Sequence, residues 1–234
     1  MRIDELGLNP SIMQFLSEQK ITKLYPPQAD AVKAGLLEGQ KILVAAPTAS
    51  GKTLIAILSV IRFLSNNSGK IVYLTPLRAL ASEKYGEFKK MEKLDFGRKI
   101  TTAISTGDLD SVDKESENAD IIVLTNEKMD SLIRHGVEWI EKIGLVIADE
   151  VHLIGDKERG PTLEVVLTKL KELESNPQIV GLSATITNSD EIAKWLGCKL
   201  VFSDWRPVPL TEGVFDSGTI IWNNGNSEIG RAHV

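Results

Sequence analysis

Short runs of consecutive apolar residues alternate along the chain with longer stretches in which apolar positions recur every three or four residues. The short runs predict β-strands buried on both faces, because such strands have no polar side. They lie at residues 42–45, 71–74, 101–104, 121–124, 145–148 and 179–182. The longer stretches predict helices near residues 52–64, 77–94, 127–134, 163–173 and 190–195. This alternation is typical of a doubly wound α/β domain, a mainly parallel sheet with helices on both faces.

The two ends of the chain and one internal segment depart from this pattern. Residues 1–20 predict an N-terminal helical segment, ahead of a domain that we expect at residues 21–205. Residues 108–120 are acidic and poor in apolar side chains, which predicts a solvated loop or a frayed helix. Pro207 and Pro209 interrupt regular structure, and the chain from Gly213 on is rich in Gly, Asn and Ser. Residues 206–228 are therefore expected to form a connecting segment after the domain.

Residues 229–234 resemble the read-through of a common sequencing adapter. We therefore expect them to be an artefact, in which His233 carries no chemistry.

Composition is average for a globular protein, with 42% hydrophobic and 25% charged residues. The 27 Lys and Arg against 32 Asp and Glu give a net charge of −5, which argues against binding nucleic acid through an overall positive field. Cys198 has no cysteine partner, and no apolar run approaches the length of a membrane helix. The sequence therefore predicts a soluble, cytoplasmic protein with no membrane partner.

A loop of mostly small residues follows the first predicted strand and precedes a helix; it comprises Ala46, Pro47, Thr48, Ala49, Ser50, Gly51, Lys52 and Thr53. Such a loop points several backbone N–H groups at one place, where the helix N-terminus also favours an anion. Lys52 can reach β- and γ-phosphate oxygens, and the Thr53 hydroxyl can ligate Mg²⁺. Ala46 stands where the general phosphate-loop pattern has its first glycine. The loop nevertheless predicts an ATP site.

Two adjacent carboxylates, Asp149 and Glu150, follow the buried strand at residues 145–148. Ligands bind at this carboxyl edge in open α/β sheets. Asp149 suits Mg²⁺ coordination through water, and Glu150 suits the activation of an attacking water. The alternative is an ordinary acidic loop. His152 has no Cys or His cluster beside it, so zinc is not indicated.

Seven segments together resemble the ordered motifs of superfamily-two DExH-box helicases. In chain order they are residues 25–28, 46–53, 75–81, 106–108, 125–128, 149–152 and 183–185. Residues 157–164 and 204–210 resemble the Ski-two-like group, most closely its archaeal DNA-repair helicases. The resemblance implies the first RecA-like lobe of an ATP-dependent DNA helicase. Such an enzyme couples Mg-ATP hydrolysis to 3′-to-5′ movement on single-stranded DNA and to unwinding, in repair or at stalled forks.

The resemblance also implies roles for individual residues. Gln28 would recognise adenine through its amide, while Tyr25 either packs on the base or fills core. Contacts to the DNA sugar-phosphate backbone are implied for Arg78, Thr106, Gly107 and Thr125. Coupling between nucleotide and DNA is implied for His152, Ser183 and Thr185. Because such contacts are local, the net negative charge does not exclude single-stranded or forked DNA.

Family members carry further domains, which we do not expect within these 234 residues. Residues 206–228 resemble the start of the connection to a second RecA-like lobe, which is followed by winged-helix and ratchet domains. Arginines of that second lobe reach the γ-phosphate, so we expect the isolated lobe to bind ATP weakly and hydrolyse it very slowly. Three alternatives stay open: an RNA helicase of the same group, a P-loop ATPase that does not act on nucleic acid, and a binding module without turnover.

Overall fold

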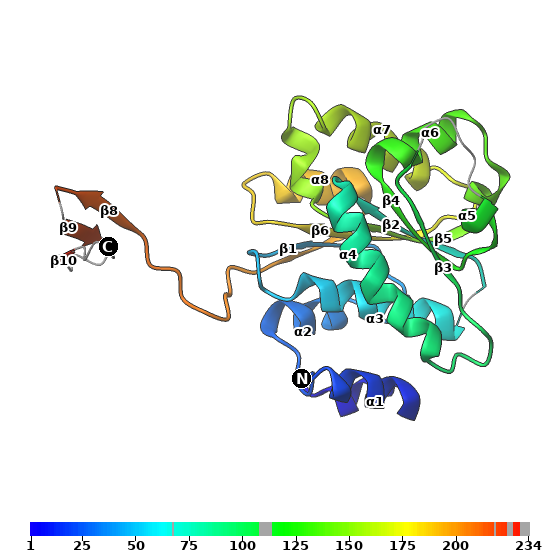
Figure 1. Cartoon of the computed structure of the whole chain (residues 1–234), viewed down its shortest axis with the longest axis horizontal. Coiled ribbons are helices and arrows are strands. Elements are labelled where there is room, and N and C mark those ends of the chain that lie inside the picture. The colour runs from blue at the N-terminus through cyan, green and yellow to red at the C-terminus, as the bar shows by residue number, and fades with distance from the viewer. Residues whose placement is uncertain (67, 108–113, 218, 224–226, 230–234) are drawn as a thin grey trace.

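A seven-stranded parallel sheet forms the centre of the computed structural model, which describes all residues except 67, 108–113, 218, 224–226 and 230–234 (Figure 1). Its strands are β1 (Ile42–Ala45), β2 (Lys70–Thr75), β3 (Thr102–Ser105), β4 (Ile121–Thr125), β5 (Ile143–Ala148), β6 (Gln178–Ser183) and β7 (Lys199–Phe202). They are arranged in the order β3-β4-β2-β5-β6-β1-β7, and every neighbouring pair is parallel. This arrangement confirms the predicted α/β fold.

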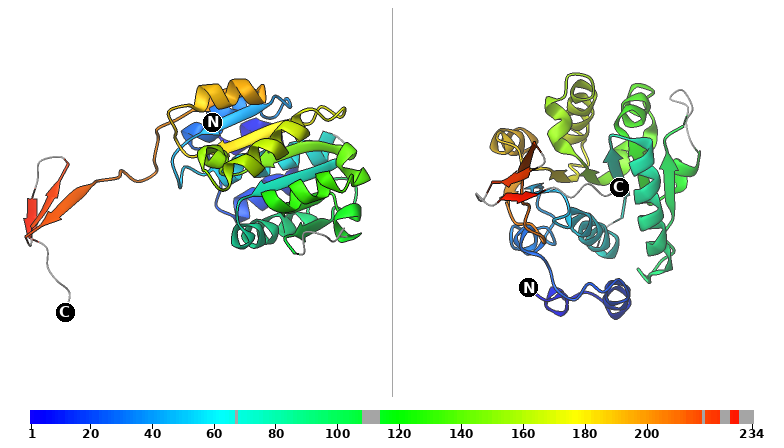
Figure 2. Two further views of the ribbon diagram at one scale, coloured as in Figure 1. Left: turned by 90° about the horizontal axis from the view of Figure 1, so that it is seen from above. Right: turned by 60° about the vertical axis from the view of Figure 1, so that its left-hand side comes forward.

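Helices cover both faces of the sheet (Figures 1 and 2). One face packs against α2 (Pro26–Lys33), α3 (Lys52–Asn66) and α4 (Arg78–Lys89), and α1 (Pro10–Glu18) lies on the far side of α2 and α3 from the sheet (Figure 1). The opposite face packs against α6 (Asn126–Arg134), α7 (Gly160–Lys171) and α8 (Ser189–Leu196). The short helix α5 (Lys114–Asn118) contacts the edge strand β3.

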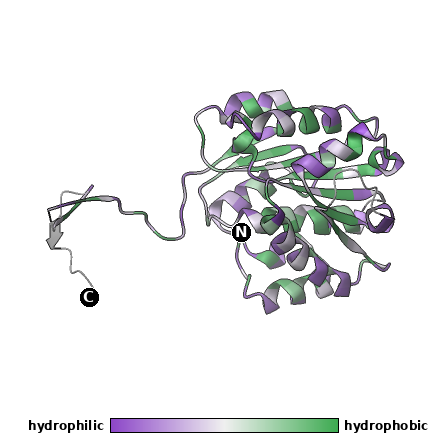
Figure 3. Cartoon of the chain, turned by 45° about the horizontal axis from the view of Figure 1, so that its top comes forward, coloured by the Kyte–Doolittle hydropathy of each residue, from purple (hydrophilic) through white to green (hydrophobic). Residues whose placement is uncertain are grey.

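Side chains that alternate along each strand enter the two cores in turn. On β2, Ile71 and Tyr73 join the core beneath α3 and α4, whereas Val72 and Leu74 join the core beneath α6 and α7. Because both faces are covered, the central strands are mostly apolar, and they appear as hydrophobic ribbons between more polar helices in Figure 3. The continuous apolar runs in the sequence have this origin.

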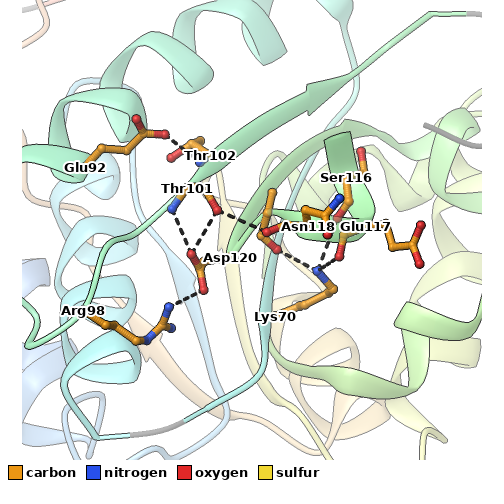
Figure 4. A network of polar contacts seen from close by, with 10 residues as sticks. Lys70, Glu92, Arg98, Thr101, Thr102, Ser116, Glu117, Asn118 and Asp120 are labelled. Atoms are coloured by element: carbon orange, nitrogen blue, oxygen red, sulfur yellow. Dashed lines mark hydrogen bonds and ion pairs between the residues drawn. The ribbon is translucent and has the colours of Figure 1, made fainter. Parts of the chain in front are cut away.

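A polar network fixes the edge of the sheet at the start of β3 and β4 (Figure 4). The Asp120 carboxylate accepts hydrogen bonds from the Thr101 backbone N–H (2.8 Å) and from Arg98. The buried Lys70 ammonium donates to the carbonyl oxygens of Glu117 (2.7 Å) and Ala119 (2.7 Å), at the end of α5. These contacts lie at the amino edge of the sheet, so they stabilise the fold without entering the candidate site.

The N-terminal segment contains a 3₁₀ turn (Ile3–Leu6) and α1. Helix α2 was not predicted, because a Pro-Pro pair such as Pro26 and Pro27 also suits a turn. They occupy the first turn of the helix, where a missing N–H has no cost. The helix predicted at residues 77–94 ends at Lys89 and continues as a 3₁₀ turn (Lys90–Lys93). In the acidic segment, the described part forms α5, whereas residues 108–113 lie outside the described residues.

Strand β7 was missed because it is a half-exposed edge strand whose apolar run spans only residues 200–202. After it the chain is extended and then forms β8 (Gly213–Asp216), β9 (Thr219–Trp222) and β10 (Ser227–Ile229), an antiparallel sheet apart from the main domain (Figure 2). No strand was predicted within this segment. Its β-forming residues, among them Val214, Phe215 and Ile220, outweigh the Gly, Asn and Ser that surround them.

Within the described ranges, no helix combines the length and the apolar character that crossing a membrane requires.

Candidate active site

The carboxyl edge of the sheet brings the predicted functional segments together in an order set by the strands. The phosphate loop after β1, the Ser183–Thr185 segment after β6 and Asp149 after β5 follow three neighbouring strands. The segments that carry Arg78, Thr125 and Thr106 follow β2, β4 and β3, the other half of the same edge. The sheet thus separates the expected nucleotide residues from the expected DNA contacts.

The phosphate loop is held open by two residues in the left-handed region, Ala49 (φ 65°) and Gly51 (φ 83°). The Ala46 N–H donates to the Ser183 carbonyl oxygen (3.1 Å), which attaches the start of the loop to β6. The Lys52 ammonium bends back over the loop and donates to the carbonyl oxygens of Ala46 (2.9 Å) and Pro47 (3.1 Å). The loop therefore holds the Lys52 ammonium close to its own backbone, and a bound phosphate could attract this ammonium away from the two carbonyl oxygens.

The surroundings of Lys52 favour a negatively charged ligand. Burial lowers the pKa of Lys52, Glu150 and Asp149 counteract that effect only in part, and Arg206 lowers the pKa further. The carboxylates nearby thus do not fully offset the cost of burying the charged Lys52 ammonium. Phosphate oxygens would supply the additional negative charge.

Two features of the loop test whether a nucleotide fits. The Ser50 hydroxyl is 1% exposed and has no hydrogen-bond partner among the described residues. At Gly51, an added Cβ would clash with the Gln28 side-chain nitrogen, so only glycine allows this approach of the loop to α2. A cradle with an unpartnered donor and no room for a side chain suits phosphate groups.

Asp149 is fixed by three hydrogen bonds. Its Oδ2 accepts from the Tyr73 hydroxyl (2.6 Å), and its Oδ1 accepts from the Glu150 N–H (3.0 Å). Its own N–H donates to the Leu74 carbonyl oxygen (2.9 Å). Burial, followed by the charge of Asp149, raises the pKa of Tyr73 well above its usual value, so the hydroxyl keeps its proton and donates.

Tyr73 was not predicted as a site residue. The only signal in the sequence is a hydroxyl inside an otherwise apolar strand, and a buried tyrosine hydroxyl needs a partner.

Glu150 is half-buried and adopts a left-handed backbone conformation (φ 54°, ψ 43°) that is unfavourable for a residue with a side chain. The His152 Nδ1 lies 3.2 Å from the Glu150 Oε2 and 3.3 Å from the Ala184 N. Without a proton it accepts from the Ala184 N–H, and with a proton it donates to Glu150, so it bonds only one of them at a time. His152 therefore lies between Glu150 and the Ser183–Thr185 segment. Within that segment the Ser183 hydroxyl is buried and donates to the Ala184 carbonyl oxygen (2.8 Å), while Thr185 is exposed.

Gln28 belongs to the first turn of α2, contacts the phosphate loop through its side chain and is 3% exposed. Its Oε1 accepts from the Tyr25 N–H (2.7 Å), and its Nε2 donates to the Gly51 carbonyl oxygen (2.9 Å). Each end of the amide keeps one further valence for a ligand. A cavity of about 510 Å³ opens beside Gln28, Tyr25 and Thr53.

Tyr25 packs against the chain that leaves the domain. Its ring is 45% exposed and lies 4.7 Å from the ring of Trp205 between centroids. Tyr25 therefore neither fills the core nor faces solvent alone, and Trp205 was not predicted as part of this region.

The expected DNA contacts differ in accessibility. Arg78, the first residue of α4, and Gly107 are exposed, and Thr106 is half-buried. Thr125 is 5% exposed, and its hydroxyl oxygen accepts from the Lys128 N–H (3.3 Å) as the cap of α6. Asp108, the third residue of its motif, lies outside the described residues.

Among the described residues, no cluster of three or more His, Cys, Asp or Glu side chains could hold a metal ion alone. Mg²⁺ usually needs only one or two protein ligands together with phosphate oxygens and water. Thr53 and Asp149 are the side chains that fit this role.

The known proteins that this chain resembles are helicases. Residues 25–192 match the family model described as DEAD/DEAH box helicase. The chain is 50% identical over 228 residues to the ATP-dependent DNA helicase Hel308 of Pyrococcus abyssi, which covers 97% of this chain and 31% of that protein. It is 46% identical to the Hel308 of Methanocella arvoryzae, over 99% of this chain and 31% of that protein. The chain thus spans about a third of the length of these curated relatives.

A solved structure supports the fold. The crystal structure of the DUF1998 helicase MrfA matches with a TM-score of 0.69 at 24% identity, covering 85% of this chain and 33% of that chain. Because the family model covers most of the domain, including the phosphate loop and Asp149, the chain belongs to the DEAD/DEAH box helicase family.

Proposed function

We propose that this chain is the first motor lobe of an ATP-dependent DNA helicase that moves 3′ to 5′ on single-stranded DNA and unwinds duplexes in repair or at stalled forks. Residues 21–205 form the RecA-like lobe, residues 1–20 precede it, and residues 206–228 lead toward a second lobe. The single observation that carries the proposal is the hydrogen-bonded convergence of the phosphate loop, the acidic pair and the Ser183–Thr185 segment at one sheet edge. The similarity to the Hel308 proteins, which are ATP-dependent DNA helicases, favours DNA as the track.

The roles of the residues follow from their chemistry. The phosphate loop binds the phosphates through backbone N–H groups, and Lys52 leaves the carbonyl oxygens of Ala46 and Pro47 to contact the β- and γ-phosphates. Gln28 uses its remaining donor and acceptor valences on the adenine edge. When bound, Mg²⁺ neutralises phosphate charge, and Thr53 and Asp149 would hold it.

Glu150 acts as the general base. Its carboxylate takes a proton from the attacking water, the water oxygen bonds to the γ-phosphorus, and the bond to the β,γ-bridging oxygen breaks to give ADP and inorganic phosphate. The His152 Nδ1 bonds either the Ala184 N–H or the Glu150 carboxylate, so a change at the γ-phosphate that shifts this choice alters the bond to the Ser183–Thr185 segment.

The lobe contacts the sugar-phosphate backbone of the DNA strand and not its bases. Arg78 and Gly107 are exposed for this purpose at the β2, β4 and β3 half of the sheet edge, and Thr125 contributes chiefly by capping the N-terminus of α6. Such contacts set register without reading sequence, which suits a motor that steps along a strand.

The test is the ATPase and unwinding activity of the complete protein on matched DNA and RNA duplexes that carry single-stranded overhangs. We expect single-stranded DNA to stimulate hydrolysis and a 3′ DNA overhang to support unwinding. Equal or greater activity on RNA would favour the RNA helicase instead. Hydrolysis that no nucleic acid stimulates would favour a P-loop ATPase with another role.

A further inference from the structure

A buried lysine outside the recognised motifs contacts the candidate metal site. Lys84, in the middle of α4, is 7% exposed. A buried ammonium is costly unless its donors are paired, so its partners indicate what holds it there.

The Lys84 ammonium has a hydroxyl and two carboxylates as partners. Its Nζ lies 3.1 Å from the Thr53 Oγ1, 3.1 Å from the Glu87 Oε2 and 3.2 Å from the Glu83 Oε1. The Glu83 side chain is mainly exposed, whereas that of Glu87 is about one-third exposed. The two carboxylates thus anchor the ammonium from α4, while Thr53 belongs to the first turn of α3.

Lys84 stays charged in this position. The Glu87 and Glu83 carboxylates lie within 3.2 Å of its Nζ and stabilise the positive charge. An ammonium only donates hydrogen bonds, so the Thr53 hydroxyl oxygen must accept from it.

This contact has a consequence for the Thr53 hydroxyl. One lone pair of its oxygen is committed to Lys84, which leaves the other lone pair and the hydroxyl hydrogen for a ligand. A metal ion needs that free lone pair. A hydroxyl whose orientation is already fixed loses less conformational freedom when it binds.

We propose that Lys84 is a positioning residue for the metal site, holding the Thr53 hydroxyl in the orientation that ligates Mg²⁺ and tying α4 to the phosphate loop. This inference rests on the proposed function, because it takes Thr53 as a metal ligand. It assigns Lys84 no contact with the nucleotide.

The test measures binding without turnover. The affinity of the 234-residue chain for a fluorescent ATP analogue, N-methylanthraniloyl-ATP, is compared in Mg²⁺ and in EDTA, and the ratio gives the metal-dependent gain. In Lys84→Met we expect this gain to fall about fivefold, as for one lost hydrogen bond, while the affinity in EDTA stays within about twofold of wild type. Lys84→Arg, which keeps the charge and donors, should retain most of the gain.

Glu83→Gln is the matched control, because it removes a charge beside Lys84 and leaves the Thr53 contact in place. On a Thr53→Ala background, Lys84→Met should cause no further loss. Lys84→Gln is measured alongside, and the variant that melts cooperatively is used for the comparison.

The inference would be overturned if Lys84→Met kept the full wild-type gain in nucleotide affinity from Mg²⁺. It would also be overturned if Lys84→Met lost affinity equally in Mg²⁺ and in EDTA. If wild type itself shows no metal-dependent gain, the proposed function fails instead, so the two failures are distinguishable.

Discussion

The buried Tyr73 hydroxyl donates a 2.6 Å hydrogen bond to the Oδ2 of Asp149, across the neighbouring strands β2 and β5. The contact holds the carboxylate at the position where the candidate site needs a metal ligand. No sequence motif marks Tyr73, yet it determines the orientation of a residue that a motif does mark.

Tyr73→Phe should therefore slow ATP hydrolysis by the complete protein about tenfold, since a hydrogen bond to a charged group contributes about 1.5 kcal/mol or more. We expect the affinity for ATP in EDTA to change little, because Tyr73 does not contact the phosphate loop. Steady-state ATPase assays and nucleotide titrations measure both quantities. Tyr85→Phe, on α4, is the matched control; wild-type turnover in Tyr73→Phe would show that Asp149 needs no such support.

Glu150 should carry backbone strain. Its left-handed conformation costs about 1 to 2 kcal/mol for a residue with a Cβ, more than glycine loses through its flexible unfolded state. Both Glu150→Ala and Glu150→Gly remove the carboxylate, but Glu150→Gly should have a free energy of unfolding higher by about 0.5 to 1 kcal/mol. Urea denaturation provides the comparison, and equal or reversed stabilities would refute the strain.

Cys198 should be an unreactive thiol. Burial raises its pKa to about 12, which Lys41 offsets only slightly, so almost no thiolate forms near neutral pH. In the folded chain, an aromatic disulfide reagent at about pH 8 should modify Cys198 far more slowly than in urea. Rapid labelling of the folded chain would contradict the burial of this thiol.

The pH dependence of stability should report on Lys52. Because the pKa of Lys52 is lowered by folding, the unfolded chain binds more protons between that lowered pKa and 10.5. The free energy of unfolding of wild type should therefore rise, relative to Lys52→Met, as pH increases through this window. A saturating nucleotide should abolish the difference by restoring the charged form. A fall with increasing pH would have the wrong sign.

Much of the domain could be predicted because local pattern and burial agree there. The strand run at residues 42–45 and the loop ending in Lys52 and Thr53 lie where the sequence places them. The edge strand β7 has no comparable apolar run, and α2 begins with prolines that also suit a turn. The sheet of β8 to β10 was missed because cross-strand pairing is a long-range property that composition does not reveal.

Prediction of the site failed for residues whose role depends on tertiary contact. Tyr73 and Lys84 belong to no phosphate-binding pattern and gain their partners only when β2 packs beside β5 and α4 packs beside α3. Gln28 was expected at the base, and the structure shows in addition that its amide connects α2 to the phosphate loop.

The central claim is that Lys52 binds phosphate and Glu150 activates water, and one comparison in the complete protein tests it most directly. ATP affinity and DNA-stimulated turnover are measured for Lys52→Ala and Glu150→Gln. We predict that Glu150→Gln binds ATP as wild type does but no longer hydrolyses it, whereas Lys52→Ala loses both binding and hydrolysis. Unchanged hydrolysis in either variant, or lost binding in Glu150→Gln with retained binding in Lys52→Ala, would contradict the roles assigned to these two residues.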